Sequence, residues 1–218
     1  ALAALTSGAG NVAVGYQSML EHTTGGLNTC YGYQTMFSTN AGSNSLASRR
    51  NTFMGYQSGS GQWGDSAGSD ENVGIGYLAL NGALDDADNN TVVGASAGRT
   101  ITTGDNNSIF GNASEPSAAG ASNQTVIGYN AAGHGDNIVV LGNTSVTAWH
   151  PPDDNGVDLG ATNYRFANLY VADMQMSNEG TGGNEVDGTE GNWSLQEGED
   201  DLYVINRKTG KKFKIKLE

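Results

Sequence analysis

The chain has 218 residues, a mass of 22.5 kDa and a net charge of −13. Leucine, isoleucine, valine and phenylalanine together make up only about 18% of its residues, a share typical of chains that are disordered or fold by repetition. Its longest apolar runs, Ala1–Leu5 and Ile138–Leu141, are too short for a membrane-spanning helix or a signal peptide, and its single cysteine excludes an intrachain disulfide. The acidic surplus argues against nucleic acid as a partner.

A five-residue pattern that ends in glycine recurs eight times, with 14 to 23 residues between successive glycines. The copies are Asn11–Gly15, Asn28–Gly32, Asn51–Gly55, Asn72–Gly76, Asn90–Gly94, Asn107–Gly111, Gln124–Gly128 and Ile138–Gly142. Short runs of β-forming residues that each end at a glycine corner predict the coils of a parallel β-solenoid, also called a β-roll. We therefore expect an all-β fold in which residues 1–148 form about eight coils.

Both faces of the repeated strand are mostly apolar, and strand side chains alternate between faces. The residue before each glycine is always large, and we expect it to fill the coil: Val14, Tyr31, Met54, Ile75, Val93, Phe110, Ile127 and Leu141. The preceding residue then faces outward and needs another partner. Because one slender rod buries little apolar surface, we expect two identical chains to cover that face in a homotrimer.

Two smaller features of the repeat also predict local structure. The asparagine that opens most copies is expected to stack on its neighbours as a ladder at the corner of the coil. Three residues after each glycine the side chain is always small, which indicates a tightly packed turn or second short strand.

The repeat resembles two groups of fibrous surface proteins. Gly10–Gly15 and Asn137–Gly142 are similar to the repeat of trimeric autotransporter adhesin heads, a left-handed β-roll, whereas Asn28–Gln34 and Asn51–Gln57 resemble repeats of bacteriophage tail fibres. The resemblance covers residues 1–146 and implies a homotrimeric, extracellular rod. For a tail fibre it implies a virion protein that attaches to a host cell-surface glycan or outer-membrane protein, with other tail fibre proteins on its N-terminal side.

The two ends of the chain depart from the repeat. Ala4-Leu5 is similar to Ala79-Leu80, so we expect the chain to begin inside an earlier coil of a longer protein. Residues 149–176 are expected to form a junction. Its segment Asp158–Tyr170 resembles a motif near the ends of phage tail fibres, where a self-cleaving chaperone domain commonly follows; too few residues remain here for that domain.

Residues 177–218 are expected to form a small C-terminal β tip. Candidate strands are Trp193–Gln196, Leu202–Asn206 and Phe213–Leu217, the last two joined as a hairpin with Gly210 in its loop. All five lysines of the chain lie between residues 208 and 216, whereas residues 1–200 carry a large acidic surplus. Such an abrupt change of charge marks a separate module.

Several side chains carry metal-binding chemistry, but a structural role is the favoured interpretation of each. Two groups have the oxygen ligands that calcium prefers, although solvated turns explain both: Asp85, Asp86 and Asp88, and Asp153, Asn155 and Asp158. The histidines share no ligand spacing, although one of them could meet its copies on a trimer axis: His22, His134 and His150. Cys30 is expected to be a small buried apolar residue. We predict no cofactor and no resident metal.

Binding is the predicted role, because insertions in a solenoid form outer loops that often recognise partners. The two largest insertions are the loops Phe37–Arg50 and Gly59–Glu71. Trp63, in the second loop, is either an anchor tucked onto its own coil or a platform that stacks on a sugar or a protein. The basic hairpin of the tip could meet an anionic glycan. The receptor-binding candidates are therefore Trp63, Gln62, Asp65, Asn40, Asn44, Arg49, Tyr203, Arg207, Lys208 and Lys211.

The favoured function is that of the distal part of a trimeric phage tail fibre, and three alternatives stay open. A polysaccharide-degrading tailspike needs two carboxylates at a defined separation, and the sequence singles out no such pair. A purely structural spacer needs no receptor contact. A bacterial trimeric adhesin head fits the repeat, but no outer-membrane barrel segment follows it here. We expect the protein not to be an enzyme.

Overall fold

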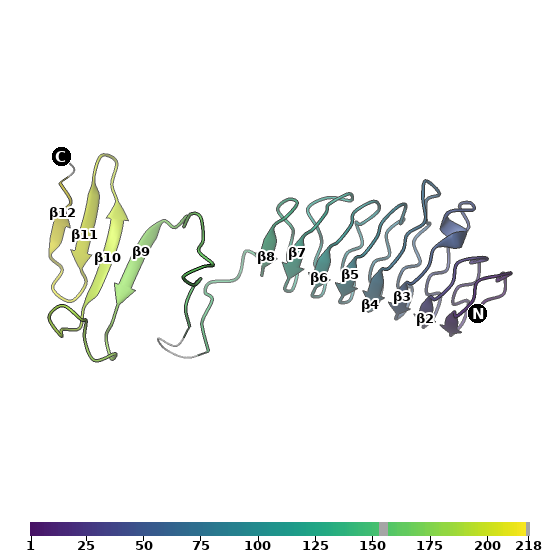
Figure 1. Cartoon of the computed structure of the whole chain (residues 1–218), viewed down its shortest axis with the longest axis horizontal. Helices are drawn as coiled ribbons and strands as arrows, with labels where there is room; N and C mark the ends of the chain where they lie inside the picture. The colour runs from purple at the N-terminus through teal and green to yellow at the C-terminus, as the bar shows by residue number, and fades with distance from the viewer. Residues whose placement is uncertain (153–156, 217–218) are drawn as a thin grey trace. The chain divides into compact units, whose positions relative to one another are not determined.

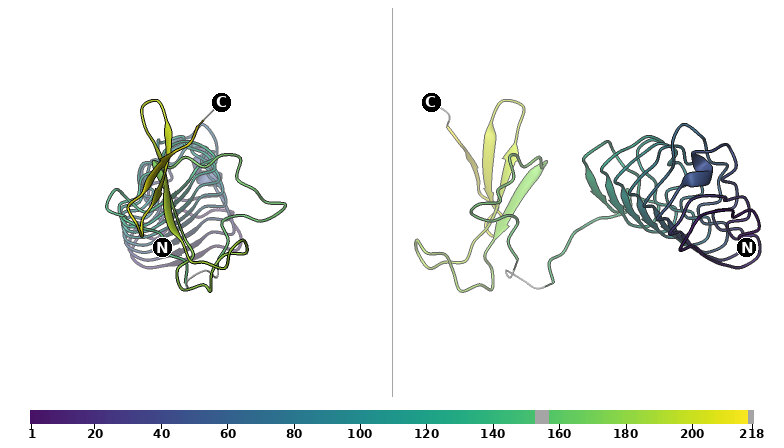
Figure 2. Two further views of the ribbon diagram at one scale, coloured as in Figure 1. Left: turned by 90° about the vertical axis from the view of Figure 1, so that its left-hand side faces the viewer. Right: turned by 45° about the vertical axis from the view of Figure 1, so that its right-hand side comes forward.

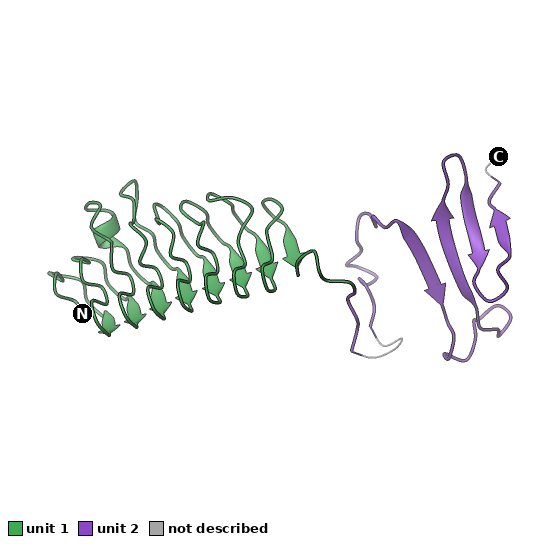
Figure 3. Cartoon of the chain, turned by 180° about the vertical axis from the view of Figure 1, so that it is seen from behind, with its two compact units in different colours: residues 1–147 green, residues 148–218 purple. Residues whose placement is uncertain are grey.

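The computed structural model describes residues 1–152 and 157–216 and divides the chain into two compact units, Ala1–Thr147 and Ala148–Glu218 (Figure 3). Within the described residues the fold is all-β apart from one short 3-10 helix, η1 (Ser45–Ala47). No helix in this part of the chain has the length and apolar character needed to cross a bilayer.

The first unit is a parallel β-solenoid, as predicted (Figure 1). Each copy of the repeat supplies one three-residue strand: β1 (Val12–Val14), β2 (Thr29–Tyr31), β3 (Thr52–Met54), β4 (Val73–Ile75), β5 (Thr91–Val93), β6 (Ser108–Phe110), β7 (Thr125–Ile127) and β8 (Val139–Leu141). The strands pair in chain order, and equivalent positions of the repeat lie opposite one another, as in Val14↔Tyr31 and Tyr31↔Met54. An end-on view shows the successive coils stacked behind one another (Figure 2).

The side chains of the strands point the opposite way from the prediction. The middle residue of each strand points into the coil, and Cys30, Phe53, Val92, Ile109 and Val126 are fully buried there. The residue before the glycine points outward instead, and six of the eight copies of it are between 38% and 56% exposed. The middle position includes alanine, cysteine and glycine. A narrow coil accepts these small side chains more readily than the tyrosine, methionine and phenylalanine of the outer position.

Part of the remaining interior comes from residues just beyond the glycine corner, and Trp63, Leu84 and Ile101 of the longer connecting segments also belong to the core. The small residue three positions after the glycine is buried in seven coils, in agreement with the prediction of a tightly packed turn: Ser18, Thr35, Ser58, Ala79, Ala97, Ser114 and Ala131. The next residue is a buried methionine or leucine in three of these coils, at Met19, Met36 and Leu80. Most coils therefore close over one strand side chain and one small residue, and the three coils with Met19, Met36 and Leu80 also enclose a flexible apolar residue. The coil of β4 has Gly74 at the strand position.

The glycine at the corner is required by the close stacking of the coils. Gly32 has φ +143°, and a Cβ atom at this position would lie only 2.4 Å from the carbonyl oxygen of Gly55 in the next coil. A side chain here would therefore clash with the backbone of the adjacent coil, in addition to straining the residue's own backbone.

The predicted asparagine ladder is confirmed. Its buried members are Asn28, Asn51, Asn72, Asn90 and Asn107. At each step the side-chain oxygen of one asparagine accepts two hydrogen bonds from the next, as when Asn51 Oδ1 accepts from the backbone and side-chain nitrogens of Asn72 at 3.0 and 3.2 Å. The side-chain nitrogen of Asn72 also donates to the carbonyl oxygen of Ala87 at 2.7 Å. The ladder thus satisfies buried backbone groups that lie outside the strands.

The alignment expected at the start of the chain is wrong by three residues. Leu2, rather than Leu5, is the equivalent of the buried Met19, because Leu2 N donates to Ser18 O at 3.1 Å just as Met19 N donates to Thr35 O at 2.9 Å. Leu2 also packs against the hydrophobic core of the solenoid.

The second unit contains a four-stranded antiparallel sheet. Its strands are β9 (Asp173–Ser177), β10 (Asn192–Glu197), β11 (Leu202–Asn206) and β12 (Lys212–Lys214), in the order β12-β11-β10-β9. The predicted strands Trp193–Gln196 and Leu202–Asn206 are confirmed. The strand expected at Phe213–Leu217 is confirmed in part, because β12 overlaps it at residues 213 and 214 and forms the predicted hairpin with β11, in which Phe213 pairs with Val204. Gly210 in the hairpin loop has φ +73°, as its position requires.

Two details of this unit differ from the prediction. The strand β9 was not expected, and it crosses the predicted boundary between residues 176 and 177. The alternation of apolar residues with lysines in Phe213–Leu217 predicts a strand with Phe213 on its buried face, but Phe213, in the edge strand β12, is 49% exposed. Leu217, placed on the same face, lies outside the described residues.

Candidate functional site

The outward-facing residues of the eight solenoid strands form a continuous surface, called here the outer face. It consists of two columns that follow the stack: Val12, Thr29, Thr52, Val73, Thr91, Ser108, Thr125 and Val139, and beside them Val14, Tyr31, Met54, Ile75, Val93, Phe110, Ile127 and Leu141. Neither column contains a charged residue, although the chain as a whole carries a net charge of −13.

A third uncharged column follows the glycine corners. Four of its members are tyrosines whose rings stack from coil to coil, Tyr16 on Tyr33, Tyr33 on Tyr56 and Tyr56 on Tyr77, with centroids 5.1, 5.2 and 5.3 Å apart. All four side chains stay at least 42% exposed. Beside them, the side-chain nitrogen of Gln34 donates to the side-chain oxygen of Gln17, and that of Gln57 donates to Gln34.

Trp63 lies inside its own coil. Its side chain is 1% exposed, its ring packs edge-on against Phe53 with centroids 6.1 Å apart, and its Nε1 donates to Gly59 O at 2.9 Å. This buried position agrees with the interpretation of Trp63 as an anchor tucked onto its own coil, not with that of a stacking platform. A stacking platform would require the ring to leave a fully satisfied buried site, and we therefore assign Trp63 to the core.

The polar candidates of the two loops fall into two groups. Asn44 and Asp65 are brought together, since Asp65 Oδ1 accepts hydrogen bonds from the backbone nitrogens of Asn44 and Ser45 at 2.7 and 3.0 Å and so caps η1. Arg49 forms a 3.2 Å ion pair with Asp70 of the next coil. Asn40 and Gln62 are exposed. Asn44, Asp65 and Arg49 therefore join neighbouring coils, whereas Asn40 and Gln62 are accessible to a partner.

Two of the aspartates considered as calcium ligands, Asp85 and Asp88, cap backbone groups of a neighbouring coil, whereas Asp86 is exposed. Asp85 accepts from the backbone nitrogen and the hydroxyl of Ser66 at 2.6 and 2.8 Å, and the hydroxyl hydrogen bond is the main cause that lowers the pKa of this carboxyl. Asp88 accepts from Asp70 N at 2.7 Å. Burial is the main cause that raises the Asp88 pKa, and the nearby Asp70, Asp105 and Asp86 carboxylates raise it further. Asp153 and Asn155 lie outside the described residues, and Asp158 is exposed.

The histidines and the cysteine also have defined places. His22 is fully buried beside the asparagine ladder, with Nε2 3.3 Å from Asn28 Nδ2, so it lies inside its own coil and not on a surface that sister chains could share. Burial lowers its pKa. His134 and His150 are exposed. Cys30 is buried as predicted, and desolvation raises the pKa of its thiol to about 12.

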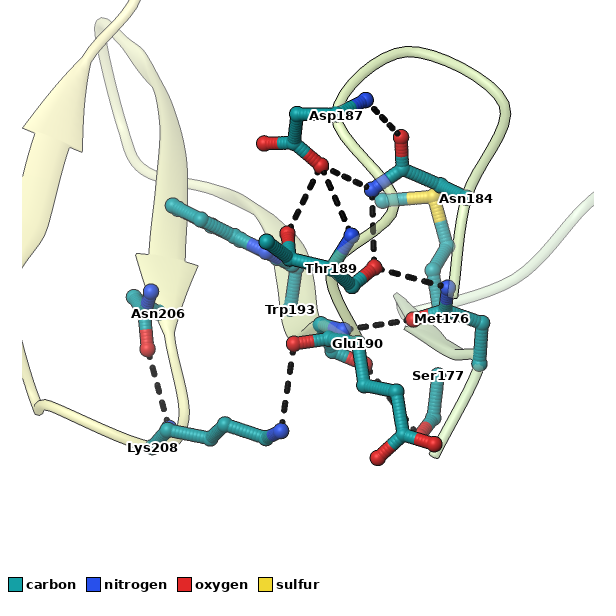
Figure 4. Close-up of a pocket in the computed structure, with 11 residues that line it drawn as sticks. Met176, Ser177, Asn184, Asp187, Thr189, Glu190, Trp193, Asn206 and Lys208 are labelled. Atoms are coloured by element: carbon teal, nitrogen blue, oxygen red, sulfur yellow. Dashed lines mark hydrogen bonds between the residues drawn. The ribbon is translucent and has the colours of Figure 1, made fainter. Parts of the chain in front are cut away.

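A cleft of about 480 Å³ lies at one end of the C-terminal sheet (Figure 4). Its floor is a row of three paired residues on adjacent strands, Met176 of β9, Trp193 of β10 and Asn206 of β11. Its wall is the loop between β9 and β10, which contributes Asn184, Asp187, Thr189 and Glu190. Sequence reasoning missed this cleft; the available signal was a loop rich in glycine, asparagine and acidic residues immediately before the candidate strand that contains Trp193.

Of the candidate residues in the tip, only Lys208 lines the cleft. Lys208 Nζ donates to Glu190 O at 3.1 Å and pairs with Glu179 at 3.2 Å, and so fastens the loop to the hairpin. Arg207 Nε donates to Ser194 Oγ at 2.7 Å, and the Tyr203 hydroxyl is 3.3 Å from Asp201 Oδ2. Lys211 is exposed. The acidic turn meets the basic hairpin through Lys214 and Asp201, which lie 2.6 Å apart.

The junction segment, residues 157–171, exposes many large apolar side chains. Leu159, Tyr164 and Tyr170 are 78%, 82% and 91% exposed, and Val157, Phe166, Leu169 and Val171 are also exposed. Between residues 157 and 171 the backbone hydrogen bonds of the described structure are the reciprocal pair between Ala161 and Tyr164. A soluble monomer rarely exposes so much apolar surface in one short segment.

Comparison of this chain with protein-family models, with curated proteins and with solved structures finds no match.

Proposed function

We propose that three copies of this chain associate through the outer face of the solenoid and form part of an extracellular attachment fibre, the distal part of a bacteriophage tail fibre. The observation that carries this proposal is the composition of the outer face, which has apolar and hydroxyl side chains along eight coils and no charge. Copies with a net charge of −13 repel one another. They can therefore meet only where the acidic side chains are absent.

The exposed apolar side chains support a second copy as the partner rather than an unrelated protein. The outer face and the junction segment are both apolar and exposed, and burial in a permanent homo-oligomer would remove both from water in every molecule. A repeating surface also matches a second copy well, because identical coils give the same spacing along both partners. Three chains around an axis would cover the faces of all three.

The attachment role rests on the resemblance of the repeat and of residues 158–170 to tail fibres, together with the chain order. In chain order the solenoid precedes a distinct module with its own sheet and cleft, an order that suits presentation of a binding module by a fibre. The accessible loop residues Asn40 and Gln62 and the tip residues Arg207 and Lys211 remain candidates for contact with the host surface.

Sedimentation equilibrium on the full chain tests the assembly. We expect a trimer at micromolar concentration, and we expect Met54→Asp, which places a charge on the outer face, to give monomers or dimers. The matched control is Ala118→Asp, at an exposed loop position away from the strands. A folded monomer in the unmodified protein, or a trimer that tolerates Met54→Asp as well as Ala118→Asp, would overturn the proposed interface. Blocking of phage adsorption by the purified trimer then tests attachment.

A further inference from the structure

We propose that the cleft of the C-terminal unit binds a neutral pyranose, presented as part of a surface polysaccharide. The inference deepens the attachment role and rests on it for its biological meaning. It depends on residues that lie apart from the outer face of the solenoid, namely Met176, Trp193, Asn206 and the loop that runs from Asn178 to Gly191.

The floor of the cleft is suited to the apolar face of a sugar ring. Trp193 lies between Met176 and Asn206 in one row across three strands, so an indole ring, a thioether and an amide share one surface (Figure 4). The ring of Phe213 lies 6.1 Å from that of Trp193 and supports its position. Pyranose rings carry a C–H face that packs on aromatic rings, while their hydroxyls project at the edge towards polar groups.

Unused donors and acceptors surround this floor. In the described part of the chain, Trp193 Nε1 has no hydrogen-bond acceptor, so its N–H is available to a ligand. Asp187 Oδ1 accepts three hydrogen bonds from Asn184 and Thr189, whereas its second oxygen accepts none from the described residues. Asn206 Oδ1 holds the hairpin turn by accepting from the backbone nitrogens of Lys208 and Thr209, which leaves its amide nitrogen for a ligand. Such pairs of donors and acceptors match vicinal hydroxyl groups.

The wall of the cleft is held in place before any ligand arrives. Asn184 accepts from the backbone nitrogens of Val186 and Asp187 at 2.8 and 3.1 Å and donates to Thr189 O at 2.8 Å. Lys208 ties the loop to the hairpin through Glu179 and Glu190. A loop ordered by its own hydrogen bonds loses little entropy on binding.

Charge selects a neutral ligand over an acidic one. Among the described residues that line the cleft, Lys208 is the one cation, and it is already paired with Glu179. The pKa of Glu179 is lowered chiefly by the Asn192 side chain and then by Lys208 itself. Asp187 and Glu190 also line the cleft. The acidic side chains therefore outnumber the cations, and a carboxylate or phosphate on the ligand would be repelled.

Saturation-transfer NMR on the full chain tests this site. The probes are the methyl glycosides of glucose, galactose and mannose, N-acetylglucosamine, and glucuronate as the acidic arm. We expect transfer to the C–H protons of at least one neutral probe and at least about tenfold weaker binding in Trp193→Ala. The matched control Trp149→Ala, which changes an exposed tryptophan that does not line the cleft, should leave binding unchanged. Asp187→Asn, which preserves the loop hydrogen bonds, should weaken binding several-fold. This variant tests the site even if Trp193→Ala fails to fold.

Three results would overturn the inference: no transfer to any neutral probe, equal transfer in Trp193→Ala and in the unmodified protein, or binding of glucuronate alone. Sedimentation of the same samples reports separately on the trimer. A trimer without sugar binding removes the site and leaves the fibre proposal, whereas sugar binding by a monomer removes the fibre assembly and leaves the site.

Discussion

A Cβ atom added to Gly74 would lie 2.7 Å from Cδ1 of Phe53, the residue that pairs with Gly74 in the preceding coil. Gly59, which takes the place of the buried methionine or leucine in the same coil, would place a Cβ atom 2.5 Å from the same ring carbon. One large side chain thus replaces three smaller ones. The exception in the repeated strand, a glycine in the middle of β4, is therefore a packing partner of the phenylalanine in β3.

Gly74→Ala is expected to lower the free energy of unfolding by about 1–3 kcal/mol, because the added methyl group overpacks a full interior. The backbone of Gly74 is not left-handed, so the cost comes from packing alone. In a Phe53→Leu background the same substitution should cost less, since the smaller side chain leaves room for the methyl group. Urea denaturation of the two single variants and the double variant measures this coupling. Equal costs of Gly74→Ala in both backgrounds would show that the two residues do not compete for space.

Asn72→Ala is expected to destabilise the solenoid strongly. The substitution leaves the buried backbone nitrogen of Asn90 and the carbonyl oxygen of Ala87 without their partners, whereas the side-chain oxygen of Asn51 keeps the backbone nitrogen of residue 72 as a donor. Each orphaned group costs about 1–3 kcal/mol, so the total loss should be about 2 kcal/mol or more. Asn112→Ala is the control, because the side chain of this exposed residue makes a single hydrogen bond, to Ala95 O at 3.1 Å. Similar thermal midpoints for the two variants would contradict the assigned role of the ladder.

The period, the ladder and the small buried residue could be predicted from the sequence, because each is set by residue type at a fixed spacing. Which face of each strand points into the coil could not be predicted from hydrophobicity, because both faces of these three-residue strands are mostly apolar and neither has charged side chains that would identify the solvent side. Side-chain size carried the missing signal: the inner position holds Ala13, Cys30 and Gly74, and the outer one Tyr31 and Met54. The cleft was not predictable because it depends on the pairing of β9, a strand without a strong sequence pattern.

Asp88→Asn is expected to stabilise the protein at neutral pH. The asparagine oxygen can still accept from Asp70 N, while the charge that burial and three neighbouring carboxylates disfavour is removed. Because the pKa of Asp88 is raised in the folded state, the folded chain binds more protons than the unfolded chain as the pH falls towards 3.8, the ordinary value for this carboxyl. The contribution of Asp88 to stability is therefore favourable at low pH and is lost as the pH rises through its folded-state pKa.

Urea titrations at pH 7 and pH 3 measure this difference. Asp88→Asn should have the higher midpoint at pH 7 and lose most of that advantage at pH 3. Asp86→Asn, at the exposed neighbouring position, is the control and should change the midpoint less. A lower midpoint for Asp88→Asn at pH 7 would mean that the charged form of the hydrogen bond to Asp70 outweighs the repulsion.

His22 is expected to make the second coil sensitive to mild acid. Its ring is fully buried next to Asn28, and burial lowers its pKa below the ordinary value of 6.5. Below pH 6.5 the unfolded chain therefore binds a proton that the folded chain does not, so the stability present at neutral pH is lost as the pH falls through the folded-state pKa.

Hydrogen exchange of the Asn28 and Cys30 amides at pH 7.5 and 5.5, corrected for the intrinsic rates, should show loss of protection at the lower pH. His22→Gln, which keeps a polar group beside the ladder without titrating, should lose this pH dependence, and exposed His134→Gln should retain it. Equal pH dependence in both variants would assign the effect to other groups.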